Sequence, residues 1–136
     1  MPVSLIVLAA GMGTRMNSEL PKVLHHVAAA PLLHHALSAG RALEPSRIVL
    51  VAGHGAEAVT AQAVAQAAPM LAQAAGEAIV LYGDTPFIRP ETLAAMLEAR
   101  ARHAVVVLGF EARDPGRSGR LIAEGANLHR IAEFKD

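Results

Sequence analysis

The sequence contains no cysteine among its 136 residues. Without cysteine the chain cannot form a disulfide framework or a thiolate metal site, and it is compatible with a reducing compartment. The sequence also lacks any apolar run of the roughly 18 residues that a membrane-spanning helix needs. No basic region precedes the short apolar stretch at its N-terminus, as a secretion signal would require. We therefore expect a cytoplasmic protein with no membrane partner.

The chain has no excess of charge of either sign, because 12 Lys and Arg residues balance 12 Asp and Glu residues. A neutral protein has no general attraction to nucleic acids or to anionic membranes. No nucleic-acid partner is therefore expected, and any anion-binding site must be a local arrangement of a few residues.

Apolar residues are abundant, at 53% of the chain, although many of them are alanine. A length of 136 residues suits one domain with one core, since domains cluster at about 100–150 residues. Alanine buries little area, so the core must rely on leucine, isoleucine and valine. We expect residues 1–136 to form one domain.

Four short, nearly continuous apolar runs are typical of strands buried on both faces of a sheet. They are Val3–Leu8, Arg47–Val51, Ala78–Tyr82 and Val105–Leu108. Helical patterns alternate with them, over Pro31–Leu43, Ala56–Ala68 (closed by Pro69) and Pro90–Arg102. This alternation predicts an α/β fold with three layers around a Rossmann-like, mainly parallel sheet. A short C-terminal β-hairpin is predicted from Arg120–Ala123 and Leu128–Ala132.

A glycine-rich stretch directly follows the first predicted strand. Gly11 and Gly13 leave main-chain N–H groups uncovered, so a polyanion can lie against the backbone. Thr14 adds a hydroxyl donor, Arg15 a planar fork that matches pairs of phosphate oxygens, and Lys22 a mobile positive charge. The spacing fits neither the dinucleotide-binding G-x-G-x-x-G motif nor a Walker loop. The stretch predicts a phosphate-binding loop with two cations; the alternative is an ordinary strand-to-helix turn.

This stretch carries a resemblance to a known family. The motif L-A-A-G-M-G-T-R-M (residues 8–16), followed by P-K-V-L-H (residues 21–25), is similar to that of the sugar-phosphate nucleotidyltransferases. It most resembles the uridylyltransferase domain of the bifunctional N-acetylglucosamine-1-phosphate uridylyltransferase/glucosamine-1-phosphate acetyltransferases. The resemblance implies a Mg²⁺-dependent enzyme that converts UTP and N-acetylglucosamine 1-phosphate into a UDP-sugar and pyrophosphate.

Asp84 follows the third predicted strand in the segment Tyr82-Gly83-Asp84-Thr85-Pro86. Ligands of an open parallel sheet bind outside the carboxyl ends of its strands, so this carboxylate is expected in the same crevice as the phosphate-binding loop. Mg²⁺ would bridge the carboxylate to the phosphates there. On the residues alone, Asp84 could equally form a turn. The segment resembles the metal-binding segment of the family, which favours Asp84 as a metal ligand.

Two further segments resemble the sugar-binding parts of the family. Residues 114–121 are similar to its D-P-x-x-Y-G-R loop, in which Gly119 would meet the sugar, although Ser118 stands where tyrosine is usual. Residues 130–136 resemble its I-V-E-x-K-D segment, in which Glu133 would bind sugar hydroxyls. Without the resemblance, Glu133 reads as a solvated strand residue.

The resemblance thus implies a site with assigned roles. The catalytic residues are Arg15 and Lys22, which neutralise charge; a sugar phosphate is already a nucleophile, so no general base is needed. The nucleotide-binding residues are Leu8, Ala9, Ala10, Gly11, Gly13, Thr14, Arg15, Lys22, Tyr82, Gly83 and Asp84. A zinc site at the doublets His25-His26 and His34-His35 is a weak alternative, because no acidic partner lies at ligand spacing.

The chain departs from the family in two places. Around residues 69–78 it lacks a longer segment that recognises uracil in the family, and it stops before the asparagine that gives a second metal contact and before the acetyltransferase domain. We therefore expect an incomplete nucleotidyltransferase domain, of open oligomeric state because the family trimer relies on that further domain. Alternatives are a molybdenum-cofactor type guanylyltransferase and a non-catalytic nucleotide-binding module.

Overall fold

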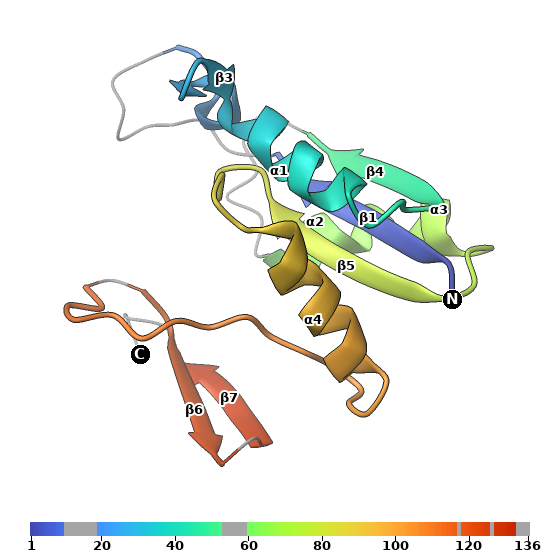
Figure 1. The fold of residues 1–136 in the computed structure, drawn as a ribbon, viewed down its shortest axis with the longest axis vertical. Helices are drawn as coiled ribbons and strands as arrows, with labels where there is room; N and C mark the ends of the chain where they lie inside the picture. The colour runs from blue at the N-terminus through green and yellow to red at the C-terminus, as the bar shows by residue number, and fades with distance from the viewer. Residues whose placement is uncertain (10–18, 53–59, 117, 126, 133–136) are drawn as a thin grey trace.

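Three parallel strands form the central sheet of the protein, in the order β4–β1–β5. The computed structural model describes residues 1–9, 19–52, 60–116, 118–125 and 127–132. The strands are β1 (Val3–Leu8), β4 (Arg47–Val51) and β5 (Glu77–Tyr82). Figure 1 shows β1 lying between the other two. The predicted α/β fold with a mainly parallel sheet is confirmed.

The middle strand, β1, is buried on both faces. Side chains of a strand alternate between faces, and those of Leu5 and Val7 pack in one cluster whereas those of Ile6 and Leu8 pack in another. All four are less than a tenth exposed. The continuous apolar run at 3–8 therefore reflects burial on two sides, as a parallel strand requires.

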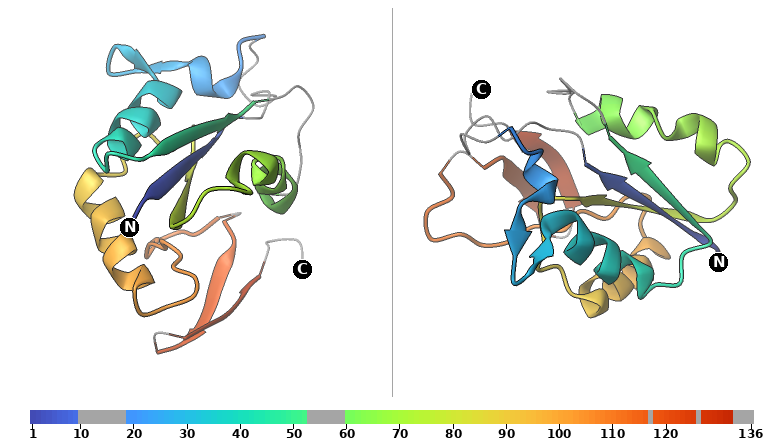
Figure 2. Two further views of the ribbon diagram at one scale, coloured as in Figure 1. Left: turned by 90° about the vertical axis from the view of Figure 1, so that its right-hand side faces the viewer. Right: turned by 90° about the horizontal axis from the view of Figure 1, so that it is seen from above.

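Helices cover the two faces of the sheet, which gives the three layers (Figure 2). On one face lie α1 (Leu32–Arg41) and α4 (Pro90–Arg100), and fully buried Leu93 of α4 belongs to the cluster of Leu5. On the other face lie α2 (Thr60–Ala65) and α3 (Ala68–Leu71), with Ala63 and Ala67 in the cluster of Ile6. Small alanine side chains bring these helices close to the sheet.

Glycine allows α1 to approach β1 closely. A Cβ atom at Gly40 would lie 2.5 Å from Cδ2 and 2.9 Å from Cδ1 of Leu5. Leu5 has no exposed surface, so it has no free space into which to turn. Any side chain at this position would therefore force Leu5 or the helix to shift.

Two antiparallel hairpins accompany the sheet in the part of the chain that the structure describes. A short one, β2 (His26–Val27) and β3 (Ala30–Pro31), follows the 3-10 helix η1 (Lys22–Leu24) and leads into α1. The second, β6 (Arg120–Glu124) and β7 (Asn127–Ala132), lies apart from the sheet at the C-terminal side of the chain (Figure 1). This second hairpin confirms the prediction for the chain's last residues.

The predicted fourth strand at Val105–Leu108 is wrong. These residues form no strand; they run as an irregular segment, and the side chain of Val105 is 75% exposed. A cavity of about 580 Å³ lies between this segment and β5, lined by Val80 and Leu81 on one side and by residues 106–110 on the other. The run has strand-type residues, but a strand also needs a paired edge, and here the cavity separates it from β5.

Pro69 does not close the second helical pattern as predicted. It lies in the first turn of α3, where its missing N–H costs no hydrogen bond. The helix expected at Ala56–Ala68 is described from Thr60 onward and breaks before α3. Within the part of the chain that the structure describes, no helix is long and apolar enough to cross a membrane.

Candidate functional site

The carboxyl ends of the three parallel strands lie at one edge of the sheet. Leu8 is in register with Tyr82 of β5 and with Val51 of β4. Past the strand ends, the backbone N–H of Gly83 donates to the Leu8 carbonyl (2.9 Å), and that of Ala9 donates to the Val51 carbonyl (2.8 Å). The glycine-rich stretch thus begins directly beside the segment that carries Asp84, as the parallel topology predicts.

Asp84 lies in a tight turn after β5. The carbonyl of Tyr82 accepts two hydrogen bonds from Thr85, one from the backbone N–H (3.2 Å) and one from Oγ1 (2.8 Å). These bonds close the turn around Gly83 and Asp84. They hold the carboxylate at the strand end, where a ligand of the sheet would lie.

Lys22 is brought to the same edge by the short helix η1. Pro21 precedes this helix with an extended backbone (φ −51°, ψ 137°), and its carbonyl accepts a hydrogen bond from the N–H of Leu24 (2.9 Å). The neighbouring Val23 is buried, so it anchors the helix against the body of the protein. Lys22 is left half-exposed at the rim.

Gly83 allows these parts to come together. A Cβ atom there would lie 3.1 Å from the Leu8 carbonyl oxygen, 3.1 Å from Cγ1 of Val23 and 3.3 Å from Cδ1 of Leu33. Few side chains tolerate contacts this close, and one of them is to backbone. Glycine at this position therefore sets how near η1 can lie to β5.

Lys22 and Asp84 form an ion pair, with 2.6 Å between Nζ and Oδ2. Their side chains are 47% and 30% exposed, and pairs this open contribute at most about 1 kcal/mol to folding. The pair is therefore weak as a source of stability. Its importance is that it places a positive charge and a carboxylate together beside the start of the glycine-rich stretch.

The donor set around Asp84 fits one type of metal site. Among the described residues, no group of three or more His, Cys, Asp and Glu side chains could hold a metal ion. A site made of protein ligands alone is therefore not present in that part of the chain. Mg²⁺, however, is commonly held by one or two carboxylates together with substrate phosphates, and Asp84 can serve as such a carboxylate.

The histidine doublets do not form the zinc site that was weighed as an alternative. Nε2 of His35 donates to the Val27 carbonyl (2.7 Å), and Nε2 of His25 donates to the Leu20 carbonyl (3.3 Å). His34 lies near Ser38. These rings bind backbone or a neighbouring hydroxyl, and that of His35 ties α1 to the β2–β3 hairpin. Among the described residues they do not gather around a common metal centre.

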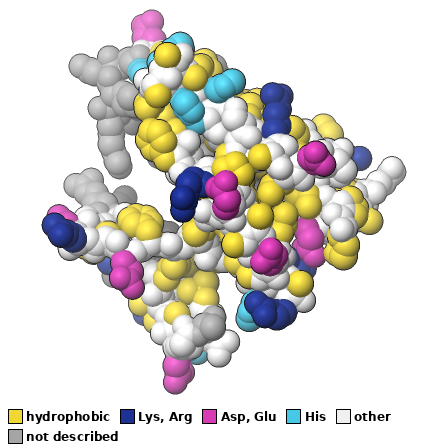
Figure 3. Space-filling view, viewed as in Figure 1, with side chains coloured by type: hydrophobic (Ala, Val, Ile, Leu, Met, Phe, Trp, Pro, Cys, Tyr) yellow, Lys and Arg dark blue, Asp and Glu magenta, His cyan; other side chains and the backbone are white. Residues whose placement is uncertain are grey.

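A cavity of about 550 Å³ lies beside this edge, between the end of β5, residues 107–112 and the base of the β6–β7 hairpin. Tyr82 and Gly119, expected to bind nucleotide and sugar respectively, both line it. In space-filling representation, this face of the molecule is hollowed between the hairpin and the body (Figure 3). The structure thus brings two separately predicted residues to one cavity.

Several of the predicted site residues lie outside the described part of the chain. They are Ala10, Gly11, Gly13, Thr14, Arg15 and Glu133. Their roles stay predictions. The described nucleotide-binding residues, Leu8, Ala9, Lys22, Tyr82, Gly83 and Asp84, all come from the carboxyl edge of the sheet or from η1 beside it. The predicted sugar-binding residue Gly119 comes from the loop that precedes β6.

Three residues at the site were not predicted. Thr85 closes the turn of Asp84, and Arg120 and Asp114 hydrogen-bond within the loop that precedes β6. Asp114 could have been found from the sequence Asp-Pro-Gly, since aspartate followed by such residues favours a side-chain to backbone turn. The contacts of Arg120 depend on how the loop folds back and leave no local signal.

The sequence matches the MobA-like NTP transferase domain over residues 5–129. The chain therefore belongs to this family, whose description is that of a nucleoside triphosphate transferase. The class of reaction that the comparison supports is nucleotidyl transfer.

Individual relatives agree with this assignment. The chain is 66% identical to the bifunctional protein GlmU of Cereibacter sphaeroides over 155 residues, which cover 98% of the chain and 34% of that protein. It is 60% identical to the protein of the same name from Dinoroseobacter shibae (all of the chain, 35% of that protein) and 52% to that from Ruegeria pomeroyi (all of the chain, 35%). The chain spans about a third of the length of these curated relatives.

The first of these alignments is longer than the chain itself. It extends over 155 positions against 136 residues in the chain. The Cereibacter protein therefore has at least 19 residues in the matched region that have no counterpart here. That these correspond to the base-recognition segment expected near residues 69–78 stays a prediction.

Proposed function

We propose that this chain is part of a Mg²⁺-dependent uridylyltransferase, which transfers the uridylyl group of UTP to N-acetylglucosamine 1-phosphate and releases pyrophosphate. The observation that carries the proposal is the convergence of Lys22 and Asp84 beside the start of the glycine-rich stretch. A cation and a carboxylate at the carboxyl edge of a parallel sheet suit a nucleoside triphosphate and its metal ion.

The proposed reaction is a displacement at phosphorus. A phosphate oxygen of the sugar 1-phosphate attacks the α-phosphorus of UTP, a new P–O bond forms, and the bond to the pyrophosphate leaving group breaks. The nucleophile is already an anion, so the protein supplies alignment and charge neutralisation and no base. Lys22, at the carboxyl edge of the sheet, is placed to neutralise the charge of the phosphates, and Arg15 would do the same from the glycine-rich stretch.

Asp84 would hold Mg²⁺, which, when bound, supplies positive charge to the triphosphate. The carboxylate is partly exposed and fixed by the Thr85 turn, so it can accept a cation without rebuilding the loop. Lys22, which neutralises Asp84 in its present position, is then available to the phosphates.

Acceptor binding is proposed for the cavity between Tyr82 and Gly119. Its volume of about 550 Å³ lies within the range of small-molecule sites, roughly 300–1,000 Å³. Gly119 offers a backbone without a side chain, and Glu133 is expected to add an acceptor for sugar hydroxyls. The identity to proteins named GlmU supports the choice of uridylyl over guanylyl transfer.

The test is pyrophosphate release with a panel of nucleoside triphosphates and sugar 1-phosphates, in the presence and absence of Mg²⁺. The expected result is Mg²⁺-dependent release with UTP and N-acetylglucosamine 1-phosphate together and with neither alone. Because the chain spans about a third of its relatives, the assay should include the longest natural form of the protein.

Two other outcomes would replace the proposal. Turnover of GTP but not UTP would assign a guanylyltransferase of the molybdenum-cofactor type. Nucleotide binding without turnover of any pair by the longest form would assign a non-catalytic nucleotide-binding module.

A further inference from the structure

The loop that precedes β6 is organised by its own side chains. It joins the irregular segment at 104–113 to the hairpin and is described at residues 114–116 and 118–120. The N–H of Gly116 donates to Oδ1 of Asp114 (3.0 Å), and the N–H of Ser118 donates to the Pro115 carbonyl (2.9 Å). These two bonds form a tight turn at the tip of the loop.

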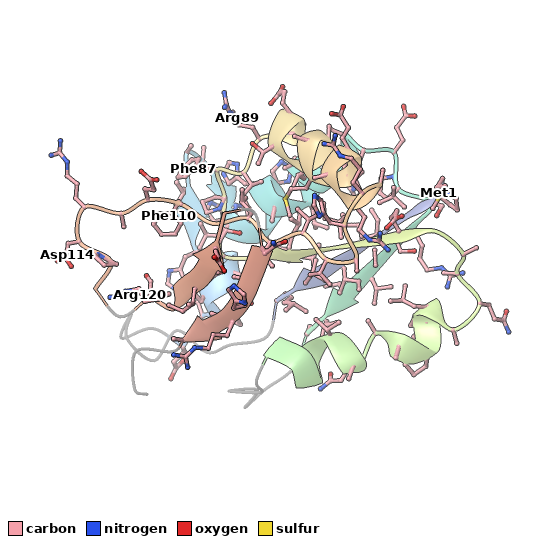
Figure 4. The ribbon with its side chains drawn as sticks, turned by 90° about the horizontal axis from the view of Figure 1, so that it is seen from below. Met1, Phe87, Arg89, Phe110, Asp114 and Arg120 are labelled. Atoms are coloured by element: carbon pink, nitrogen blue, oxygen red, sulfur yellow. The ribbon has the colours of Figure 1, made fainter. Side chains whose placement is uncertain are left out.

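Arg120 binds the same turn from the other side. Its Nη2 donates to the Gly116 carbonyl (3.2 Å), and its Nη1 donates to the Ser118 carbonyl. One planar guanidinium thus binds two carbonyls of the loop through two different nitrogens, in a rigid fork that a lysine ammonium lacks. Figure 4 shows Arg120 at the base of the loop that carries Asp114.

The loop is one wall of the cavity assigned to the acceptor. Pro115, Ser118 and Gly119 line that cavity from the loop side, and Tyr82 lines it from the end of β5. Gly119 lies between Ser118 and Arg120 in the chain, and the Arg120 guanidinium donates a hydrogen bond to the Ser118 carbonyl. The backbone expected to meet the sugar is therefore fixed by the guanidinium.

We propose that Arg120 is a positioning residue that holds the loop wall in place for the sugar 1-phosphate acceptor, without contributing to triphosphate binding. The inference rests on the proposed function for the identity of the acceptor. Its physical basis is independent of that identity. A loop ordered before binding loses little conformational entropy when the ligand arrives, whereas a loop released from Arg120 must be ordered by the ligand itself.

The opposite edge of the site provides the contrast. Lys22 and Asp84 come from η1 and from the turn after β5, and neither is hydrogen-bonded to Arg120. A change at Arg120 should therefore affect the acceptor and leave the triphosphate almost unchanged.

The test compares Arg120→Met and Arg120→Lys in the longest natural form of the protein, with Arg130→Met as the matched control. Arg130 is an exposed arginine on β7, the partner strand of β6. Binding of N-acetylglucosamine 1-phosphate and of UTP is measured separately by NMR titration. Amide hydrogen exchange of Gly116, Ser118 and Gly119 is measured without ligand.

Arg120→Met should weaken acceptor binding about tenfold, because the ligand itself must then order a loop that two charge-assisted hydrogen bonds hold in the unmodified protein, and it should leave UTP binding within about twofold. Exchange at Ser118 and Gly119 should accelerate. Arg120→Lys should restore little, since an ammonium lacks the rigid fork of two nitrogens that meets the two carbonyls, and Arg130→Met should behave like the unmodified chain.

Equal weakening for acceptor and UTP, or unchanged exchange in the loop, would overturn the positioning role. Full recovery with Arg120→Lys would overturn it too, because charge alone would then suffice. If the unmodified chain binds UTP but no sugar phosphate, the assigned acceptor is wrong and this inference falls, while nucleotide binding at Lys22 and Asp84 stands. If it binds sugar phosphate but not UTP, the proposed function fails, and the loop measurements still decide the role of Arg120.

Discussion

Nζ of Lys22 lies 2.6 Å from Oδ2 of Asp84, although 62 positions separate the two residues in the sequence. The contact joins the segment after the glycine-rich stretch to the turn after β5. Both groups are expected to bind parts of one metal–nucleotide complex, so the ammonium and the metal ion compete for the same carboxylate when no nucleotide is present. Removing Lys22 should therefore strengthen the binding of the metal ion alone and weaken the binding of the nucleotide.

Replacing Lys22 by methionine should tighten the binding of a divalent cation alone and weaken the binding of the nucleotide. An exposed pair is worth up to about 1 kcal/mol, so the cation should bind about two- to fivefold more tightly. Loss of a charge-assisted contact to phosphate should weaken UTP binding by about tenfold. Mn²⁺ titration by electron paramagnetic resonance and UTP titration by calorimetry measure the two effects.

Arg89→Met is the control for the removal of a positive charge. Arg89 is an exposed arginine just before α4, in the segment that follows Asp84. The control should change Mn²⁺ binding little. Weaker Mn²⁺ binding in Lys22→Met would contradict the competition and would mean that Lys22 orients the carboxylate for the metal.

Replacing Arg15 by alanine should lower kcat on the order of 10²-fold or more, if Arg15 stabilises the charge that builds on the departing pyrophosphate. The prediction follows from the motif, since Arg15 lies outside the described residues. It is measured as steady-state pyrophosphate release in the form of the protein that turns over. Activity within a few-fold of the unmodified enzyme would remove Arg15 from the mechanism.

Replacing Gly40 by alanine should destabilise the protein, although the same change stabilises an exposed helix by about 1 kcal/mol. The new methyl group would meet Leu5 at 2.5 Å, and overpacking of a core costs about 1–3 kcal/mol. The second effect is larger, so a net loss of about 1 kcal/mol is expected in urea unfolding. Ser38→Ala, on the exposed side of α1, is the control and should not destabilise; a more stable Gly40→Ala protein would show that α1 can move away from β1.

The 136-residue chain alone should bind nucleotide weakly and should not catalyse the reaction. The chain is expected to lack the base-recognition segment, and the resulting loss of alignment can remove several kcal/mol of barrier lowering. Large apolar side chains on the sheet are also partly exposed, among them Ile48 (39%) and Leu50 (47%) on β4, so the chain should tend to associate. A synthetic gene for residues 1–136, assayed with UTP, N-acetylglucosamine 1-phosphate and Mg²⁺, tests this; turnover near that of a full-length relative would refute it. Light scattering tests association separately.

The sequence predicted the central strands from their nearly continuous apolar runs, and β1, β4 and β5 agree with the prediction to within one residue. Burial on both faces, which these runs also predicted, holds for β1 but not for the other two: β4 is mostly exposed and β5 is buried at alternate positions. Val105–Leu108 has the same pattern and is not a strand. The residue types of this segment favour an extended backbone. Whether the segment forms a strand depends also on a neighbouring strand with which it can pair, and the local sequence does not show that neighbour.

The site, like the fold, has features that the sequence predicts and features that it does not. The meeting of Lys22 and Asp84 could be anticipated, because the parallel order places the ends of β1 and β5 together. Arg120 could not, since its two contacts depend on a turn that forms only when the loop folds back. Close packing around Gly83 was likewise invisible, because its neighbours Val23 and Leu33 come from other parts of the chain.

The central position of β1 also determines how the protein opens to solvent. Its backbone is paired to β4 on one side and to β5 on the other, and its side chains are covered on both faces. Amide deuterons in Leu5–Leu8 can therefore be replaced only when the whole sheet comes apart, whereas those of η1 and of the hairpins can be replaced through local fraying. The exchange rate of β1 amides thus reports the global unfolding free energy. A ligand that binds the folded protein at the end of β1 should slow that exchange by a factor of 1 + [L]/Kd, where [L] is the free ligand concentration and Kd its dissociation constant.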